Sequence, residues 1–167
     1  MLMLSESARA TRASESRYRI DAPNARSRSV KVIALDGPSE RVLRRLAEGA
    51  WQHATFLRAP GGSAPAQPVG GWLAGLAGET MNLIEQIASA NTIVTLSTAG
   101  ENSEMAAIVA EACRAQGKLL TALILDIDGG SEANLLKTLV PLRPYASMLV
   151  VAHGEDYVET MLTALRA

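Results

Sequence analysis

The sequence predicts an α/β fold, a three-layer Rossmann-like sandwich in which helices cover both faces of a mainly parallel sheet of about five strands. From residue 30 onward, short apolar runs alternate with segments of helical periodicity, which is the pattern of parallel strands joined by crossover helices. Hydrophobic residues make up 48% of the 167 residues, whereas aromatic residues make up only 4%. The core is therefore built from small aliphatic side chains, which suit helices packed on a parallel sheet.

The chain begins with an Arg- and Ser-rich segment, residues 1–29, that shows no sustained hydrophobic period. It has no apolar stretch of the kind that a secretory signal peptide needs, and Glu6, Glu15 and Asp21 disfavour an organelle transit peptide. We expect a flexible basic tail, followed by a single α/β domain over residues 30–167.

The domain opens with a strand, a turn and a helix. Apolar residues over 30–35 predict a buried strand, the Asp-Gly-Pro-Ser sequence at 36–39 predicts a turn, and helical spacing follows over 42–47. A second short strand is expected at 54–59. The Gly- and Pro-rich segment 59–71 is expected to form a long loop.

The rest of the domain continues the alternation. We expect strands at residues 91–99, 118–127 and 147–153. We expect helices at residues 72–90, 103–117, 133–143 and 155–167. Gly117 is placed to end the second of these helices.

Charge and cysteine content exclude several classes of function. The 16 basic and 17 acidic residues nearly cancel, so no overall attraction to nucleic acid or to an anionic membrane is expected. No apolar run reaches the length of about 18 residues that a membrane span requires. The single cysteine, Cys113, excludes an intrachain disulfide and cannot by itself make a cysteine-based metal site. We therefore expect a soluble cytoplasmic protein with no metal site and with neither nucleic-acid nor membrane partners.

The order of these elements resembles that of one known family. Residues 30–59, VKVIALDGPSERVLRRLAEGAWQHATFLRA, resemble the first strand, first glycine-rich loop, first helix and second strand of the tubulin/FtsZ nucleotide-binding domain. Residues 72–126 resemble that family's third helix, the strand before its signature loop, and the helix and strand after it. Residues 135–158 resemble the helix, strand and loop that follow. The resemblance implies a tubulin/FtsZ-like fold over nearly the whole domain.

The loops that would hold phosphate depart from the family's pattern. The first loop has Asp36, Gly37, Pro38, Ser39 and Glu40 where the family has a run of glycines. Only Gly37 suits the close approach of backbone to a phosphate.

The signature loop has Ala-Gly-Glu-Asn-Ser-Glu at residues 99–104 where the family has a glycine/threonine run. Gly100, Asn102 and Ser103 remain able to donate hydrogen bonds to an anion, whereas Glu101 and Glu104 would repel a triphosphate. The family's hydrolysis also needs an acidic loop and a second domain, for which these residues offer no match. The resemblance implies the fold without polymerising GTPase activity.

Ligands of open parallel sheets bind outside the carboxyl ends of the strands. The candidate ligand-binding residues at those ends are Asp36, Gly37, Ser97, Thr98, Gly100, Asn102, Ser103, Asp126 and His153. Acidic residues gathered there, with Asp128 beside them, have the oxygen ligands that Mg²⁺ prefers. Several of these residues also have a structural interpretation: the aspartates cap helices or complete turns, Asn102 or Ser103 caps a helix, and His153 is a hydrogen-bonded loop residue.

Two hypotheses about function follow. The first is a binding or interaction module without enzymatic activity or a cofactor, whose Ala-rich helices also permit a homodimer. The second is a Rossmann-like enzyme or binding protein that takes a nucleotide or a phosphorylated metabolite at residues 100–103, with Mg²⁺. The side chains of Glu101 and Glu104 discriminate between them, because a phosphate site survives only if both side chains point away from the helix N-terminus.

Overall fold

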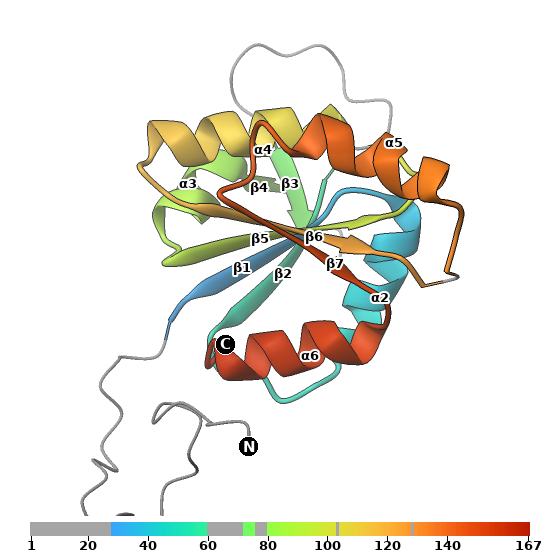
Figure 1. Cartoon of the computed structure of the whole chain (residues 1–167). Coiled ribbons are helices and arrows are strands. Elements are labelled where there is room, and N and C mark those ends of the chain that lie inside the picture. Colours follow the sequence, from blue (N-terminus) through green and yellow to red (C-terminus); the bar gives the residue numbers. More distant parts are fainter. Residues whose placement is uncertain (1–27, 60–71, 76–79, 103, 128) are drawn as a thin grey trace, which may run out of the picture.

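The computed structural model describes residues 28–59, 72–75, 80–102, 104–127 and 129–167. They form a seven-stranded sheet in the order β4-β3-β2-β1-β5-β6-β7 (Figure 1). The parallel strands are β1 (Val30–Ala34), β2 (Ala54–Arg58), β5 (Thr92–Thr98), β6 (Leu120–Leu125) and β7 (Met148–Ala152). Two short strands, β3 (Trp72–Gly75) and β4 (Thr80–Asn82), extend the β2 edge in antiparallel pairs.

Helices cover both faces of this sheet. They are α2 (Gly37–Ala47), α3 (Leu83–Ala88), α4 (Glu104–Ala115), α5 (Glu132–Leu142) and α6 (Glu155–Ala164). Helices α3, α4 and α5 lie on one face and α2 and α6 on the other (Figure 1). This confirms the predicted α/β sandwich with a mainly parallel sheet.

The core consists of two apolar layers because successive strand residues point to opposite faces of the sheet. Ile33, Ile93 and Ile124 belong to the layer that α3, α4 and α5 cover. Val32 and Val94 belong to the layer that α2 and α6 cover. Short aliphatic side chains fill both layers, which explains why so few aromatic residues suffice.

The helix predicted for residues 72–90 is wrong in its first half. That half contains β3 and β4, and the helix begins only at Leu83. Asn82 starts it, because its Oδ1 accepts hydrogen bonds from the N–H groups of Ile84 and Glu85 at 2.9 and 3.2 Å. Glycines at 75 and 78 also weaken any helix ahead of that point. The tail over 1–27 and the loop over 60–71 lie outside the described residues.

The predicted end of α4 is confirmed in detail. Gly117 has φ +62°, and the N–H of Lys118 reaches back to the Cys113 carbonyl at 2.8 Å, so the chain turns sharply toward β6. Within the described part of the chain, no helix combines the length and the apolar character needed to span a membrane.

Candidate functional site

The strand order places a crevice at the carboxyl ends of β1 and β5. After β1 the chain crosses to β2 on one side, and the next parallel strand, β5, lies on the other side of β1. Doubly wound sheets bind ligands where the strand order reverses in this way. Asp36 follows β1 and Thr98 ends β5, and the structure brings the two residues into contact at this point.

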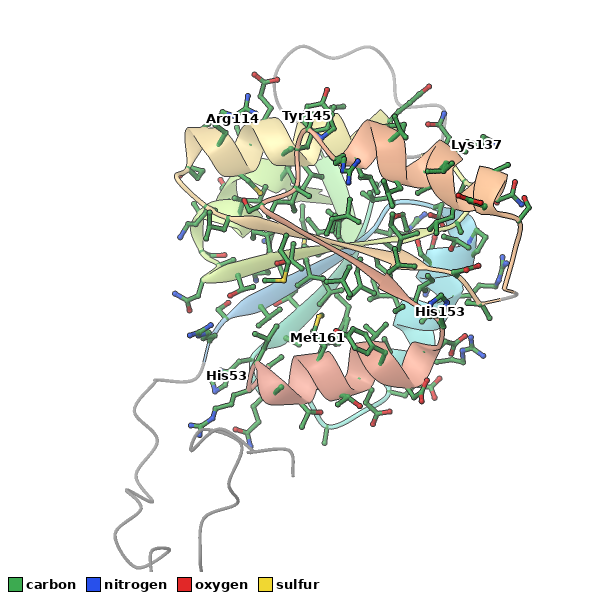
Figure 2. The ribbon with its side chains drawn as sticks, viewed as in Figure 1. His53, Arg114, Lys137, Tyr145, His153 and Met161 are labelled. Atoms are coloured by element: carbon green, nitrogen blue, oxygen red, sulfur yellow. The ribbon has the colours of Figure 1, made fainter. Side chains whose placement is uncertain are left out.

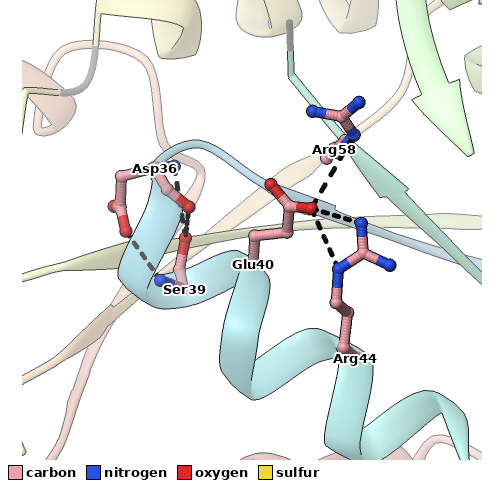
Figure 3. A network of polar contacts seen from close by, with 5 residues as sticks. All are labelled: Asp36, Ser39, Glu40, Arg44 and Arg58. Atoms are coloured by element: carbon pink, nitrogen blue, oxygen red, sulfur yellow. Dashed lines mark hydrogen bonds and ion pairs between the residues drawn. The ribbon is translucent and has the colours of Figure 1, made fainter. Parts of the chain in front are cut away.

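The Asp36 carboxylate is held by three donors from the protein. Its Oδ1 accepts from the Ser39 N–H at 2.8 Å and from the Thr98 hydroxyl at 3.0 Å, and its Oδ2 accepts from the Thr98 N–H at 2.7 Å. Ser39 completes a capping box, because its Oγ accepts from the Asp36 N–H at 3.2 Å (Figure 3). The carboxylate therefore occupies the N-terminus of α2, the position where such helices hold anions.

The rest of the first loop is also engaged by the protein itself. Pro38 has no N–H group, and the Glu40 N–H donates to the Asp36 carbonyl at 3.0 Å. The Glu40 carboxylate pairs with Arg44 at 2.6 Å and lies 3.8 Å from Nε of Arg58 (Figure 3). A Cβ added to Gly37 would meet nothing within 4 Å. Gly37 thus makes no close approach to another part of the chain that the structure describes.

The signature-like loop is closed by a side chain from α5. Gly100 has φ +92°, and its N–H donates to the Thr138 hydroxyl at 2.9 Å. The Thr138 Oγ1 also lies 3.0 Å from the Glu101 carbonyl, to which it donates. Thr138 is fully buried. This residue was missed by sequence reasoning, and the signal for it is a lone threonine on the face of α5 that otherwise carries leucines, at 135, 139 and 142.

Two further amides of that loop donate within the protein as well. The N–H of Ala99 donates to the Leu125 carbonyl at 2.8 Å, and the N–H of Glu101 donates to the Thr98 carbonyl at 3.0 Å. Asn102 accepts the N–H of Glu104 at 3.1 Å, as expected of a residue that starts α4. Ser103 lies outside the described residues.

A pocket of about 430 Å³ lies beside these loops, between α2 and the carboxyl ends of β5 and β6. Arg41 and Arg45 of α2 are basic residues of its lining, and Glu101, Asp126 and Glu155 are acidic ones. Glu101 is exposed and contributes to this pocket, whereas Glu104 is exposed and does not line it. The pocket thus carries mixed charge with a slight acidic excess.

Three of its charged residues are tied to structural partners. Arg45 forms an ion pair with Glu155 at the start of α6. Asp126 is only 8% exposed, and its Oδ1 accepts the Gly130 N–H at 3.0 Å. This hydrogen bond closes the turn that follows β6.

His153 contributes little to the pocket. Its Nδ1 lies 3.6 Å from Oδ2 of Asp126, but the side chain is 77% exposed. His153 and His53 lie at opposite ends of the sheet (Figure 2), so the two histidines do not meet. Among the described residues, no group of three or more His, Cys, Asp or Glu side chains is placed to hold a metal ion.

Ser97 lies apart from the crevice. Its side chain is buried, with Oγ 3.5 Å from the Leu123 carbonyl. It alternates with Thr98 along β5 and so faces the opposite side of the sheet. The structure therefore brings Asp36 and Thr98 together at one point and Asp126 and His153 at another, and leaves Ser97 in the core.

Two titratable groups away from this edge have shifted pKa values. Lys31 on β1 is only 9% exposed, and burial lowers its pKa below the ordinary 10.5. Its Nζ donates to the Thr55 hydroxyl at 2.9 Å. Burial likewise raises the pKa of the Cys113 thiol to about 11. Neither residue lines the pocket at the carboxyl ends.

No protein-family model and no curated protein matches this sequence. Among solved structures, the chain is similar to translation elongation factor SelB from Methanococcus maripaludis, in complex with the GTP analogue GppNHp. The two share 7% sequence identity with a TM-score of 0.48, and the match covers 86% of this chain. It covers 34% of the elongation factor, so the chain spans about a third of that protein's length.

Proposed function

We propose that this chain is a tubulin/FtsZ-like domain without GTPase activity, which acts in the cytoplasm as a binding or interaction module. The observation that supports this most directly is the Asp36 carboxylate at the N-terminus of α2. It accepts hydrogen bonds from Ser39 and Thr98 at the point where the strand order reverses. A phosphate bound at this point would need the same donors. The chain supplies its own anion at that position.

A bound phosphate would have to displace or face this carboxylate. Two unit charges about 4 Å apart repel by about 4 kcal/mol at an effective dielectric constant of about 20. A hydrogen bond to a charged group returns about 1.5 to 3 kcal/mol. Since the Ser39 and Thr98 donors are already used, the repulsion outweighs what the first loop still offers.

The second loop supports the same proposal. In a phosphate-binding loop the backbone N–H groups point at the ligand, but here those of Ala99, Gly100 and Glu101 donate within the protein. Thr138 completes the closure from α5. Glu101 adds negative charge to the neighbouring pocket. A nucleotide triphosphate therefore finds few available donors in either loop.

A thermal-shift panel tests the proposal. Wild type is heated with GTP, GDP, ATP, NAD, flavins or coenzyme A, with and without Mg²⁺, and we expect no rise in the midpoint. Ligand at 100 times its dissociation constant would add about 2.7 kcal/mol of stability, which is readily detected. A rise with one nucleotide that disappears in Gly100→Arg would overturn the proposal.

Two variants of Asp36 sharpen the test. Asp36→Gly removes the internal anion but keeps a residue tolerated at a helix N-cap, so inorganic phosphate should stabilise this variant more than wild type. Asp36→Asn is the matched control, because it removes the charge yet keeps a capping side chain in the same place. If phosphate stabilises all three proteins equally, the carboxylate does not stand in for a bound anion.

One observation favours a second candidate, a small anionic metabolite bound in the pocket. Arg41 lines the pocket and forms no ion pair with any described residue. A carboxylate or phosphate group of a ligand would suit this guanidinium. Under this alternative, a ligand-induced stabilisation would be lost in Arg41→Gln and retained in Asp36→Asn.

A further inference from the structure

The sheet ends in an edge strand, β7, that nothing in the described part of the chain covers. Its sequence is Met-Leu-Val-Val-Ala, and its one described neighbour in the sheet is β6. Edge strands of monomeric proteins are usually protected by charges, prolines or bulges, and this strand has no charged residue or proline. Met148, at its start, is 59% exposed. The strand lies between α5 and α6 (Figure 1), which leaves its outer edge available for pairing.

Helix α5 carries a stripe of four residues that can match a second copy of itself. Glu132, Leu136, Val140 and Arg143 are separated by four, four and three residues, so they lie along one side of the helix. Leu136 is 45% exposed and Val140 is 59% exposed. We call these four residues the α5 stripe. It has an acid at one end, a base at the other and two apolar residues between them.

The α5 stripe faces the β7 edge. Asn134 and Thr138 lie on the opposite flank of α5, because both meet the loop that follows β5: Thr138 binds Gly100 and Glu101, and Asn134 would crowd a Cβ at Gly100. At 100° per residue, the α5 stripe is nearly half a turn away from that flank. Since the strand order is β5-β6-β7, the flank that faces away from β5 faces β7.

The α5 stripe is complementary to itself in an antiparallel arrangement. A twofold axis near the middle of α5 places Glu132 of one copy opposite Arg143 of the other, and Leu136 opposite Val140. Neither Glu132 nor Arg143 forms an ion pair with a described residue. A twofold axis perpendicular to the sheet would also pair β7 with β7 in antiparallel orientation, centred on Val150, and the unpaired edge of each copy would then be satisfied. This charge and strand complementarity identifies the partner as a second copy.

We propose that the protein forms a twofold homodimer through β7 and the α5 stripe, with one continuous sheet running across both copies. The proposal goes beyond the function proposed above and is independent of what the loops at the carboxyl ends bind. It predicts a surface at which charge and apolar contacts each occur twice, because a twofold axis repeats every contact.

Charge reversal tests the proposed pairing. Sedimentation equilibrium of the full chain at micromolar concentration should give twice the 17.6 kDa mass of one chain. Glu132→Arg and Arg143→Glu alone each place like charges opposite one another twice, and each should weaken the dimer about tenfold. The double variant Glu132→Arg/Arg143→Glu restores opposite charges and should recover most of the affinity. A structural effect confined to one helix would not be rescued in this way.

Two further variants separate this surface from others. Met148→Lys places a charge on the edge strand and should yield monomers. Ile108→Lys is the matched control, because Ile108 is 46% exposed on α4, away from the β7 edge, and should leave the dimer intact. Thermal melts of each variant verify folding. A monomeric wild type would overturn the proposal, as would a dimer that tolerates Met148→Lys or is not rescued in the double charge reversal.

Discussion

Replacing Thr138 by Val should loosen the signature-like loop without altering the shape of the core. The Thr138 hydroxyl accepts the Gly100 N–H at 2.9 Å and donates to the Glu101 carbonyl at 3.0 Å. Valine keeps the volume and the branched shape of threonine, so the packing of α5 is retained. The substitution therefore isolates the two hydrogen bonds that fasten the loop to the helix.

The expected cost follows from the burial of these groups. A buried donor or acceptor left without a partner costs about 1 to 3 kcal/mol. Gly100 is half-buried and Glu101 is exposed, so water can replace part of what is lost at both. We expect Thr138→Val to lower the free energy of unfolding by about 2 kcal/mol, which in a chain of this size lowers Tm by about 4 to 8 °C.

Urea unfolding gives the change in stability, and amide hydrogen exchange measured by NMR reports on the loop directly. The Gly100 amide should exchange slowly in wild type and much faster in Thr138→Val. Thr138→Ser is the matched control: it deletes a buried methyl group at a cost of about 1 kcal/mol but keeps the hydroxyl, and so should preserve the protection of Gly100. Equal protection of Gly100 in Thr138→Val and wild type would refute the assigned role of Thr138.

Three other substitutions have defined outcomes. Burial raises the pKa of Cys113 from 9.0 to about 11, so the folded state keeps its proton longer and stability falls as pH rises across that interval; urea unfolding of Cys113→Ala should lack this fall. Burial lowers the pKa of Lys31, so the folded state loses this proton before the unfolded state does, and the stability of wild type rises as pH approaches 10.5. In the same assay, the free energy of unfolding of Lys31→Met should therefore fall relative to that of wild type over this interval. Gly100→Ala should lose about 1 to 2 kcal/mol because its φ is +92°. Full recovery by an added Asn134→Ala would instead assign the loss to crowding, since a Cβ at Gly100 lies 3.3 Å from Asn134 Cγ.

The architecture could be predicted because it depends on local patterns. Alternating apolar runs and helical periods located the parallel strands, and a glycine at 117 marked the end of α4. The segment 72–90 could not be assigned in the same way. Its apolar residues fit a helical period, but its first half forms two strands, of which β3 pairs with β2 and β4 pairs with β3. Tertiary pairing at a sheet edge overrides such local preference.

The candidate site depended on contacts that local sequence does not encode. Asp36 was identifiable as a cap or a ligand, but its bonds to Thr98 join residues 62 positions apart and require β1 and β5 to be neighbours. Thr138 is a further example, because it closes a loop 38 residues earlier in the chain. Only the strand order and the docking of α5 reveal that both loops are closed from within.

The covalent attachment of the Asp36 carboxylate has a consequence for the energetics of the domain. A domain that binds a soluble anion is stabilised in proportion to the logarithm of that anion's concentration, and its loaded fraction follows the metabolic state of the cell. A carboxylate built into the chain has a fixed effective concentration and cannot diffuse away. Its bonds to Ser39 and Thr98 therefore form without a ligand, and their contribution to the stability of the junction of β1, α2 and β5 does not depend on the concentration of a free anion.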